Sequence, residues 1–309
     1  MALGVEGTRV GVWTSAQGHT GCTVVLPPPG SLGAIAIRGG APGTREGAAL
    51  GPNGNVTQCH AVVLSGGSAF GLATADGVSE WCEQHDIGYD KIVARIPIVG
   101  GAIVFDLRPG GAERPGRDAG WAACEAAIED DPPVGSVGVG AGCTVGKTAG
   151  LEYAAKGGQG WAIARDGGVA VGALLAVNPL GDVLDEQGNL LAGSSAPADA
   201  DRFPAAPLPL LPPILESTVI GCLVTDAHLT KHEAARAADL AHSGIARAVS
   251  PAHTTYDGDA LFLLCAQRVE ASVDLVAHLG AIAVAAAIRV AVRAVAGQPA
   301  FGPIAADPR

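Results

Sequence analysis

A threonine at the start of an apolar run is the first residue of this chain to suggest chemistry. Ser217 and Thr218 precede the run 219–225 and follow a proline-rich stretch, 194–213, that we interpret as a linker. A linker that enters a rigid strand is a place where a chain can be cut without losing its fold. Cutting before Thr218 would leave its hydroxyl and a free α-amine, with a pKa of about 8, on the same residue. Such an amine can act as the base for the hydroxyl, which makes Thr218 a candidate N-terminal nucleophile.

Four other residues carry groups that such a nucleophile needs. Asp257 and Asp259 lie two residues apart, and acids so spaced in a turn can converge on one amine or hydroxyl. Asn178 ends an apolar run, where its amide N–H can donate to a developing oxyanion. Lys147 can supply a positive charge that steadies an oxyanion or lowers the pKa of a nucleophile. Each also has a structural explanation: an Asx-type turn, a turn cap, a surface lysine and, for Thr218, β propensity.

Strands and helices alternate in the segments that must position these residues. Short β-rich runs bounded by Gly and Pro predict strands at 10–13, 22–26, 34–38, 61–65, 92–96, 102–105, 161–164, 169–177, 218–225 and 260–265. Apolar residues at helical spacing predict helices at 68–84, 119–128 and 230–249, and a last helix that ends near 296. Thr230 and Glu233 form a capping box. This mixed order favours sheets layered with helices.

Composition limits the classes of partner. The chain has 309 residues, of which 48% are hydrophobic and 16% charged, so it can build a sizeable core. A net charge of −11 without a Lys/Arg cluster disfavours nucleic acids and anionic membranes as partners. The most apolar stretch, 273–295, contains Arg289 and Arg293 and is predicted to be a buried core helix rather than a membrane span. Residues 1–10 lack the pattern of a signal peptide.

The cysteines indicate a reducing compartment. All seven are scattered, and no C-x-x-C pair occurs among them. This pattern is typical of reduced, buried thiols in a cytoplasmic protein. The cysteines and the eight histidines show no paired-ligand spacing, so no metal and no cofactor is expected.

Five ordered segments resemble one family. They are residues 38–46, 64–72, 177–181, 217–227 and 253–259. Together they resemble the self-processing aminopeptidases, a family that includes the D-aminopeptidase/esterase, the β-peptidyl aminopeptidases and the nylon-oligomer hydrolases. The resemblance covers nearly the whole chain and is strongest toward the nylon-oligomer branch, which has a threonine nucleophile.

The resemblance implies a fold and a processing event. The expected fold is α+β, a four-layer αββα sandwich of the N-terminal-nucleophile-hydrolase type, formed by one domain over 1–309. Cleavage between Ser217 and Thr218 would divide the chain into an α chain, 1–217, and a β chain, 218–309. A homo-oligomer, and specifically a tetramer, is implied as well.

The resemblance also implies roles for individual residues. Thr218 falls on the nucleophile, and Asp257 and Asp259 fall on the acidic pair that orients it. Asn178 falls on the asparagine at the oxyanion side, and Lys147 on the catalytic lysine.

The substrate side and the cleavage site depart from the family pattern. Phe70, with Gly67, falls in the substrate-binding segment, and Phe70 stands where several members carry Tyr, so it lacks the hydroxyl. Ser217 stands where the family often has Asn or Gly. Because only the carbonyl of this residue is attacked, serine should be tolerated.

Several alternatives remain at this point. An acyltransferase of the ornithine-acetyltransferase type would use a similar self-cleaving threonine, and a relative that never cleaves would only bind a small molecule. Ser217 itself, cleaved from Glu216, would be a competing nucleophile, or a Cys or Ser elsewhere would react. The expected substrates are short peptides with small N-terminal residues, β-peptides, amino-acid amides and 6-aminohexanoate oligomers.

Overall fold

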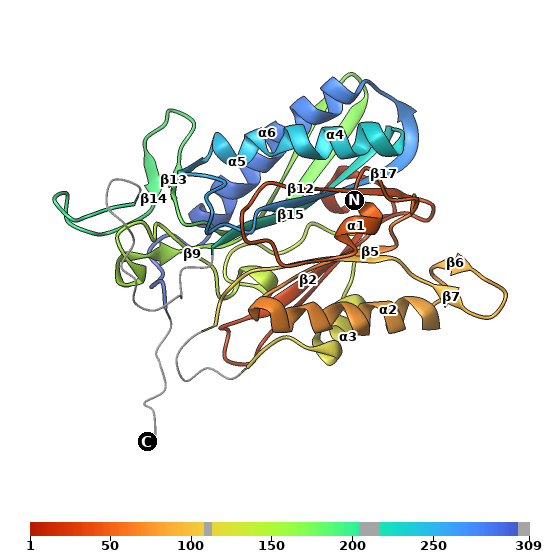
Figure 1. The fold of residues 1–309 in the computed structure, drawn as a ribbon, viewed down its shortest axis with the longest axis horizontal. Coiled ribbons are helices and arrows are strands. Elements are labelled where there is room, and N and C mark those ends of the chain that lie inside the picture. Colours follow the sequence, from red (N-terminus) through yellow and green to blue (C-terminus); the bar gives the residue numbers. More distant parts are fainter. Residues whose placement is uncertain (108–112, 204–216, 302–309) are drawn as a thin grey trace.

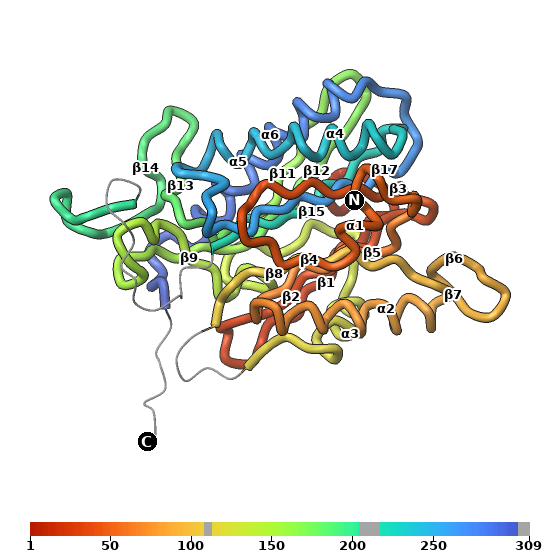
Figure 2. The backbone as a smooth tube through the Cα atoms, viewed as in Figure 1, coloured from red at the N-terminus to blue at the C-terminus, as the bar shows by residue number. Residues whose placement is uncertain are grey.

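Two five-stranded sheets form the centre of the computed structural model, which describes residues 1–107, 113–203 and 217–301. The first sheet has the order β1 (Arg9–Thr14), β2 (Gly21–Leu26), β5 (Ala61–Ser65), β8 (Val99–Ile103) and β4 (Thr44–Arg45). The second has the order β11 (Gly158–Asp166), β12 (Val169–Asn178), β15 (Thr218–His228), β17 (Ala260–Glu270) and β3 (Leu32–Ile37). Each sheet contains one parallel pair, β5–β8 or β15–β17. Figure 2 shows β3, from the start of the chain, beside β17 from its last third.

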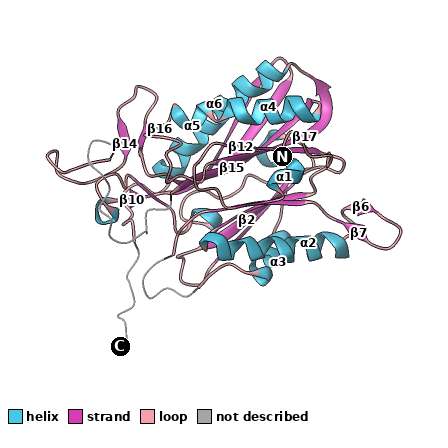
Figure 3. Ribbon diagram, viewed as in Figure 1, coloured by secondary structure: helices cyan, strands magenta, loops and turns pink. Residues whose placement is uncertain are grey.

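Helices cover the outer face of each sheet. The second sheet carries α4 (Lys231–Ala241), α5 (Ser243–Ala246) and α6 (Val273–Arg293), and the first carries α2 (Thr74–Gln84) and α3 (Arg117–Glu125). Figures 1 and 3 show the resulting order of layers, with α4 and α6 on one outside and α2 and α3 on the other. The predicted four-layer αββα sandwich is therefore confirmed.

Shorter elements connect the layers. They are the helix α1 (Gly47–Leu50), the 3-10 turns η1 (Ala2–Gly4), η2 (Ser68–Ala73), η3 (Gly138–Gly140) and η4 (Leu151–Tyr153), and the strands β6 (Tyr89–Asp90), β7 (Arg95–Ile96), β9 (Thr144–Val145), β10 (Ala155–Lys156), β13 (Asp182–Leu184), β14 (Leu190–Ala192) and β16 (Val249–Ser250).

Side chains of the second sheet alternate between two apolar layers. Along β15, Ile220 and Val224 belong to the core shared with the first sheet, whereas Val219 and Leu223 belong to the core under the helices. Because a strand directs successive side chains to opposite faces, both faces of β15 are buried, which explains its continuous apolar run. The even-numbered residues of its first half therefore face the space between the sheets, and Thr218 has the same parity.

The last helix is a core element. By length and composition alone α6 is able to cross a membrane, but most of the helix is buried, and it packs on β11 and β12. This burial agrees with the prediction of a core helix.

Two predicted elements are wrong. The helix expected over 230–249 starts with the predicted capping box but divides into α4 and α5, and the chain then enters strand β16. Gly244 lets α5 lie close against α6, since a Cβ there would lie 2.3 Å from the carbonyl oxygen of Ala281 in α6. Of the strand expected at 92–96 only Arg95–Ile96 forms a strand, β7, and the rest is the tip of the β6–β7 hairpin, where Ile92 is fully exposed with φ of 69°. Of the predicted linker 194–213, residues 204–213 lie outside the described part.

Candidate active site

Strand register places the candidate nucleophile opposite the candidate oxyanion residue. Asn178, the last residue of β12, pairs with Thr218, the first residue of β15, in the antiparallel ladder. Residues directly opposite in such a ladder direct their side chains to the same face. That face is the space between the two sheets, and both residues are buried there, Thr218 at 4% and Asn178 at 1% exposure.

The Ser217–Thr218 peptide is held at its carbonyl. The hydroxyl of Thr218 donates to the carbonyl oxygen of Ser217, which also accepts the backbone N–H of Gly258 at 2.8 Å. The N–H of Ser217 donates to the carbonyl of Tyr256 at 3.0 Å. The carbonyl to be attacked, the hydroxyl that would attack it and one backbone donor thus lie together in the uncut chain.

Lys147 points at Asn178 from a loop that follows β9. Its ammonium donates to the backbone carbonyl of Asn178 at 2.9 Å and to the side-chain Oδ1 at 3.2 Å. The ammonium is buried, and burial, opposed by the charge of Asp257, lowers the pKa of Lys147 to about 8. The amide Nδ2 of Asn178 donates to the carbonyl of Phe105 at 3.1 Å, which fixes the orientation of the amide.

Asp257 ties the acidic turn to the end of β12. Its Oδ1 accepts the backbone N–H of Leu180 at 3.2 Å, and its Oδ2 accepts both the N–H and the hydroxyl of Thr254, at 2.9 and 2.6 Å. The carbonyl of Leu180 in turn accepts the N–H of Lys147 at 2.8 Å. Asp257 and Lys147 therefore brace the same short segment, from opposite sides of one residue.

Asp259 contacts the peptide that follows Thr218. Its Oδ1 accepts the backbone N–H of Val219 at 2.6 Å, and its Oδ2 lies 2.7 Å from the Nδ1 of His253. Burial and the charge of Asp257 raise the pKa of Asp259, while the hydrogen bonds from His253 and Val219 act in the opposite direction. The acidic pair thus contacts backbone on both strands that carry Asn178 and Thr218.

The glycine-rich segment at 38–46 contacts the turn that carries Asp257 and Asp259 through its backbone. The N–H groups of Arg38 and Gly39 donate to the carbonyl of Asp259 at 3.0 and 3.2 Å. A Cβ at Gly39 would lie 2.2 Å from the backbone nitrogen of Asp259, so a side chain there would displace the turn. The sequence marked this segment only as one of the five that resemble the family, without a role for its glycines.

Comparison with known proteins decides the family. The family model described as peptidase family S58 matches residues 3–297. The chain belongs to this family. An uncharacterized aminopeptidase of Mycobacterium tuberculosis is 44% identical over 81% of this chain and 74% of its own length. The 6-aminohexanoate-oligomer endohydrolase of Paenarthrobacter ureafaciens is 30% identical over 85% of this chain and 74% of its own length.

Solved structures agree on the fold. The β-aminopeptidase of a Burkholderia species covers 94% of this chain and 85% of its own, with a TM-score of 0.69 and 20% identity. The L-aminopeptidase D-Ala-esterase/amidase of Ochrobactrum anthropi, described as a variant of the Ntn hydrolase fold, gives a TM-score of 0.70 at 19% identity over 94% of this chain and 85% of its own. This S58 protein is therefore an amide or peptide hydrolase with an Ntn-type fold.

The two residues of this S58 chain that are predicted to bind substrate, Gly67 and Phe70, lie on the turn that follows β5. Phe70 is 57% exposed, and the guanidinium of Arg114 lies 3.8 Å from its ring centroid. The N–H of Gly67 donates to the carboxylate of Asp106 at 2.7 Å, so this donor is already used. Asp106 follows Phe105, the residue that accepts from Asn178, which connects this turn to the site. The substrate-binding role of both residues stays a prediction.

Some residues of the site were missed from the sequence. Thr254, His253 and the backbone of Leu180 and Gly258 carry no distinguishing pattern of their own, because their contacts arise only when β12, β15 and the acidic turn meet. Among the described residues, no three His, Cys, Asp or Glu side chains are placed to hold a metal ion. All seven cysteines are free and buried, and burial raises the pKa of Cys222 well above its usual range, which argues against a reactive thiol there.

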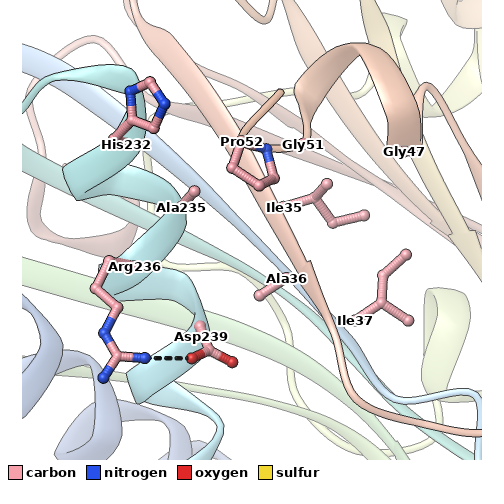
Figure 4. Close-up of a pocket in the computed structure, with 10 residues that line it drawn as sticks. All are labelled: Ile35, Ala36, Ile37, Gly47, Gly51, Pro52, His232, Ala235, Arg236 and Asp239. Atoms are coloured by element: carbon pink, nitrogen blue, oxygen red, sulfur yellow. Dashed lines mark hydrogen bonds and ion pairs between the residues drawn. The ribbon is translucent and has the colours of Figure 1, made fainter. Parts of the chain in front are cut away.

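A surface cavity of about 460 Å³ lies away from these groups. Figure 4 shows it between α4 and the segment around α1, lined by residues of β3 such as Ile35 and Ile37 and by His232, Arg236 and Asp239 of α4. No residue proposed here for chemistry lines this cavity.

Proposed function

We propose that the chain cleaves itself after Ser217 and that Thr218 is the nucleophile of both self-cleavage and hydrolysis. In the first step Thr218 Oγ bonds to the carbonyl carbon of Ser217, the Ser217–Thr218 amide bond breaks, and the amide nitrogen takes the hydroxyl proton. Water then hydrolyses the ester and leaves an α chain, 1–217, and a β chain, 218–309. The N–H of Gly258, 2.8 Å from the Ser217 carbonyl, supports this by stabilising the negative charge that develops there.

The mature site is proposed to act on amides by the same chemistry. The α-amine of Thr218 takes the proton of its own hydroxyl, which attacks the substrate carbonyl and forms an acyl-enzyme that water releases. An asparagine amide carries two N–H bonds, so Asn178 has a donor beyond its bond to Phe105. That donor and the Lys147 ammonium stabilise the oxyanion. The observation that carries this proposal is the pairing of Asn178 with Thr218 beside a buried lysine.

The proposed substrates follow from the activities for which relatives of this chain are named. Relatives are named as an aminopeptidase and a 6-aminohexanoate-oligomer endohydrolase, so we propose short peptides, amino-acid amides and 6-aminohexanoate oligomers as substrates. The net charge of −11 supports amine-bearing substrates through long-range attraction. We also propose that the protein is a homotetramer in the cytoplasm.

Intact mass of the purified protein, followed by a substrate panel, tests the function. The expected masses are those of residues 1–217 and 218–309, and the expected products are free acids. Products trapped on an added amine in preference to water would instead identify an acyltransferase. A chain that stays whole and hydrolyses none of the amides would contradict the proposal and favour a small-molecule-binding relative.

Gly258→Ala is expected to slow self-cleavage. The added Cβ would lie 2.7 Å from the carbonyl oxygen of Ala41 and 3.1 Å from Thr218 Oγ1, so the turn must shift and carry its N–H away from the Ser217 carbonyl. A displacement of this kind is expected to slow the reaction by about 10- to 100-fold. A gel time course of fragment appearance measures it. Gly116→Ala, where an added Cβ meets nothing within 4 Å, is the matched control and should cleave at the wild-type rate.

A further inference from the structure

His253 lies directly behind the acidic pair, although neither the sequence nor the family comparison assigned it a role. Its Nδ1 is 2.7 Å from Asp259 Oδ2, and its side chain is 18% exposed, against 2% for that of the aspartate. Asp259 uses its other oxygen to accept the N–H of Val219. Asp259 therefore links the imidazole of His253 to the peptide between Thr218 and Val219.

Both ring nitrogens of His253 face oxygen atoms. Nε2 lies 3.4 Å from the backbone carbonyl of His242, and a carbonyl only accepts, so Nε2 carries a hydrogen. A second hydrogen lies between Nδ1 and the carboxylate of Asp259. The backbone N–H that Asp259 accepts at 2.6 Å favours its anionic form, against burial and the charge of Asp257, which raise its pKa. An imidazolium paired with a carboxylate satisfies both ring nitrogens and both carboxylate oxygens, and the hydrogen bond from Val219 favours it over a neutral ring beside a protonated Asp259.

The groups around His253 favour its protonated form. Burial alone lowers the pKa of His253, but the hydrogen bond and charge of Asp259 outweigh it, so that the pKa is raised, against a small opposing effect of Arg38. The ring of His242, 5.1 Å away, stays neutral because burial lowers its pKa to about 4, and its Nε2 contacts the carbonyl of Ala36. The cation that faces Asp259 is therefore His253, while the negative charge of Asp257 raises the pKa of Asp259.

We infer that His253 is a positioning residue that holds Asp259 as a carboxylate aimed at the Val219 amide and so fixes the start of β15 for reaction. This inference rests on the proposed function, with Thr218 as the nucleophile. Loss of the imidazole would leave a buried carboxylate beside Asp257 without its cation, and Asp259 would take up a proton or rotate away. The contribution is present while His253 is protonated and is lost as the pH rises through its raised pKa.

Two variants separate the hydrogen bond from the charge. His253→Phe keeps the ring volume but removes both, whereas His253→Asn keeps a donor close to the position of Nδ1 at every pH. We expect His253→Phe to lower kcat by about 10- to 100-fold with little change in KM, because only the geometry of the nucleophile changes. His253→Asn should recover most of kcat and show a weaker decline at alkaline pH than the wild type.

Strand β15, which begins at Thr218, offers a matched control at its other end. His228 Nδ1 lies 2.5 Å from Glu270 Oε1, a pair of the same type, but the side chains are 55% and 87% exposed. His228→Phe should therefore leave self-cleavage, kcat and KM at wild-type values. Nitrogen NMR of labelled histidine in the wild-type protein gives a readout that needs no variant to fold: His253 should be an imidazolium at neutral pH.

The outcomes distinguish this inference from the proposed function. A neutral His253 ring at neutral pH, or a folded His253→Phe variant with wild-type kcat, overturns the positioning role. Equal losses in the Phe and Asn variants also overturn it, because packing rather than the hydrogen bond would then matter. If Thr218→Ala still cleaves or hydrolyses, the proposed function itself fails, whatever the His253 variants do.

Discussion

Thr218→Ala is expected to leave the chain whole and without hydrolase activity. The substitution removes the Oγ1 that donates to the Ser217 carbonyl, and no bond to that carbon can then form in the first step. A mature site without its nucleophile is expected to lose more than about 10³-fold in kcat. Intact mass should show one chain of 309 residues, and substrate turnover should match the buffer blank.

Folding of the variant is expected to survive, because the methyl of Ala fits the space that Thr218 fills at the end of the inter-sheet core. Thr218→Ser keeps the hydroxyl and should still cleave. Ser217→Ala also should cleave, since only the backbone carbonyl of that residue takes part. Fragments from the Thr218→Ala chain, or a Ser217→Ala chain that stays whole, would contradict the assignment and direct attention to Ser217.

Lys147→Met is expected to give the second largest loss. The change removes the ammonium that donates to Asn178 at 2.9 and 3.2 Å and with it the positive charge proposed for the oxyanion. Loss of one preorganised donor costs about 10²- to 10³-fold in kcat. Because Met fills a similar space but leaves the Asn178 carbonyl without this donor, the melting temperature should fall as well, by the cost of about one lost hydrogen bond. Steady-state kinetics and a thermal melt measure the two effects.

The pH dependence follows from the same group. The pKa of Lys147 is lowered to about 8, so its charge is present below that pH and is lost above it. Wild-type kcat should therefore decline as the pH rises through this range, and the part of the decline due to Lys147 should be absent in Lys147→Met. An undiminished decline in the variant would show that Lys147 does not supply the charge.

A second buried lysine serves as the control for Lys147. The ammonium of Lys156 donates to the carbonyls of Ala141 and Cys143 at 2.6 and 3.1 Å. Lys156→Met likewise removes a buried charge and a donor to backbone carbonyls, so it should also lower the melting temperature, but it should lower kcat less than Lys147→Met does. Equal effects on kcat would mean that any buried cation in this region suffices.

Much of the fold is encoded locally. The runs 169–177 and 218–225 are apolar without alternation, and they form β12 and β15, which have helices on one face and the first sheet on the other. The capping box at Thr230 and Glu233 starts α4 as predicted. The break after that helix was not predicted, since the segment that follows it packs closely on α6 at Gly244, a contact with a part of the chain distant in sequence.

The candidate nucleophile and acids were found because they lie in continuous motifs. Thr218 opens a strand, and Asp257 and Asp259 share one turn, so spacing in the sequence places each of them near a strand end. Lys147 and Asn178 are 31 residues apart, and the family resemblance implied a role for each but no contact between them, which the structure supplies.

The sequence by itself favoured sheets layered with helices and supplied the candidate residue types, and the family resemblance added the αββα order; cleavage after Ser217 stays a prediction. Only the tertiary structure decided which atoms meet: Asn178 opposite Thr218, Gly258 on the Ser217 carbonyl, and His253 behind Asp259. The physical reason is that local propensity sets strands and turns within a few residues, whereas register between strands and the burial of charges depend on contacts between distant segments.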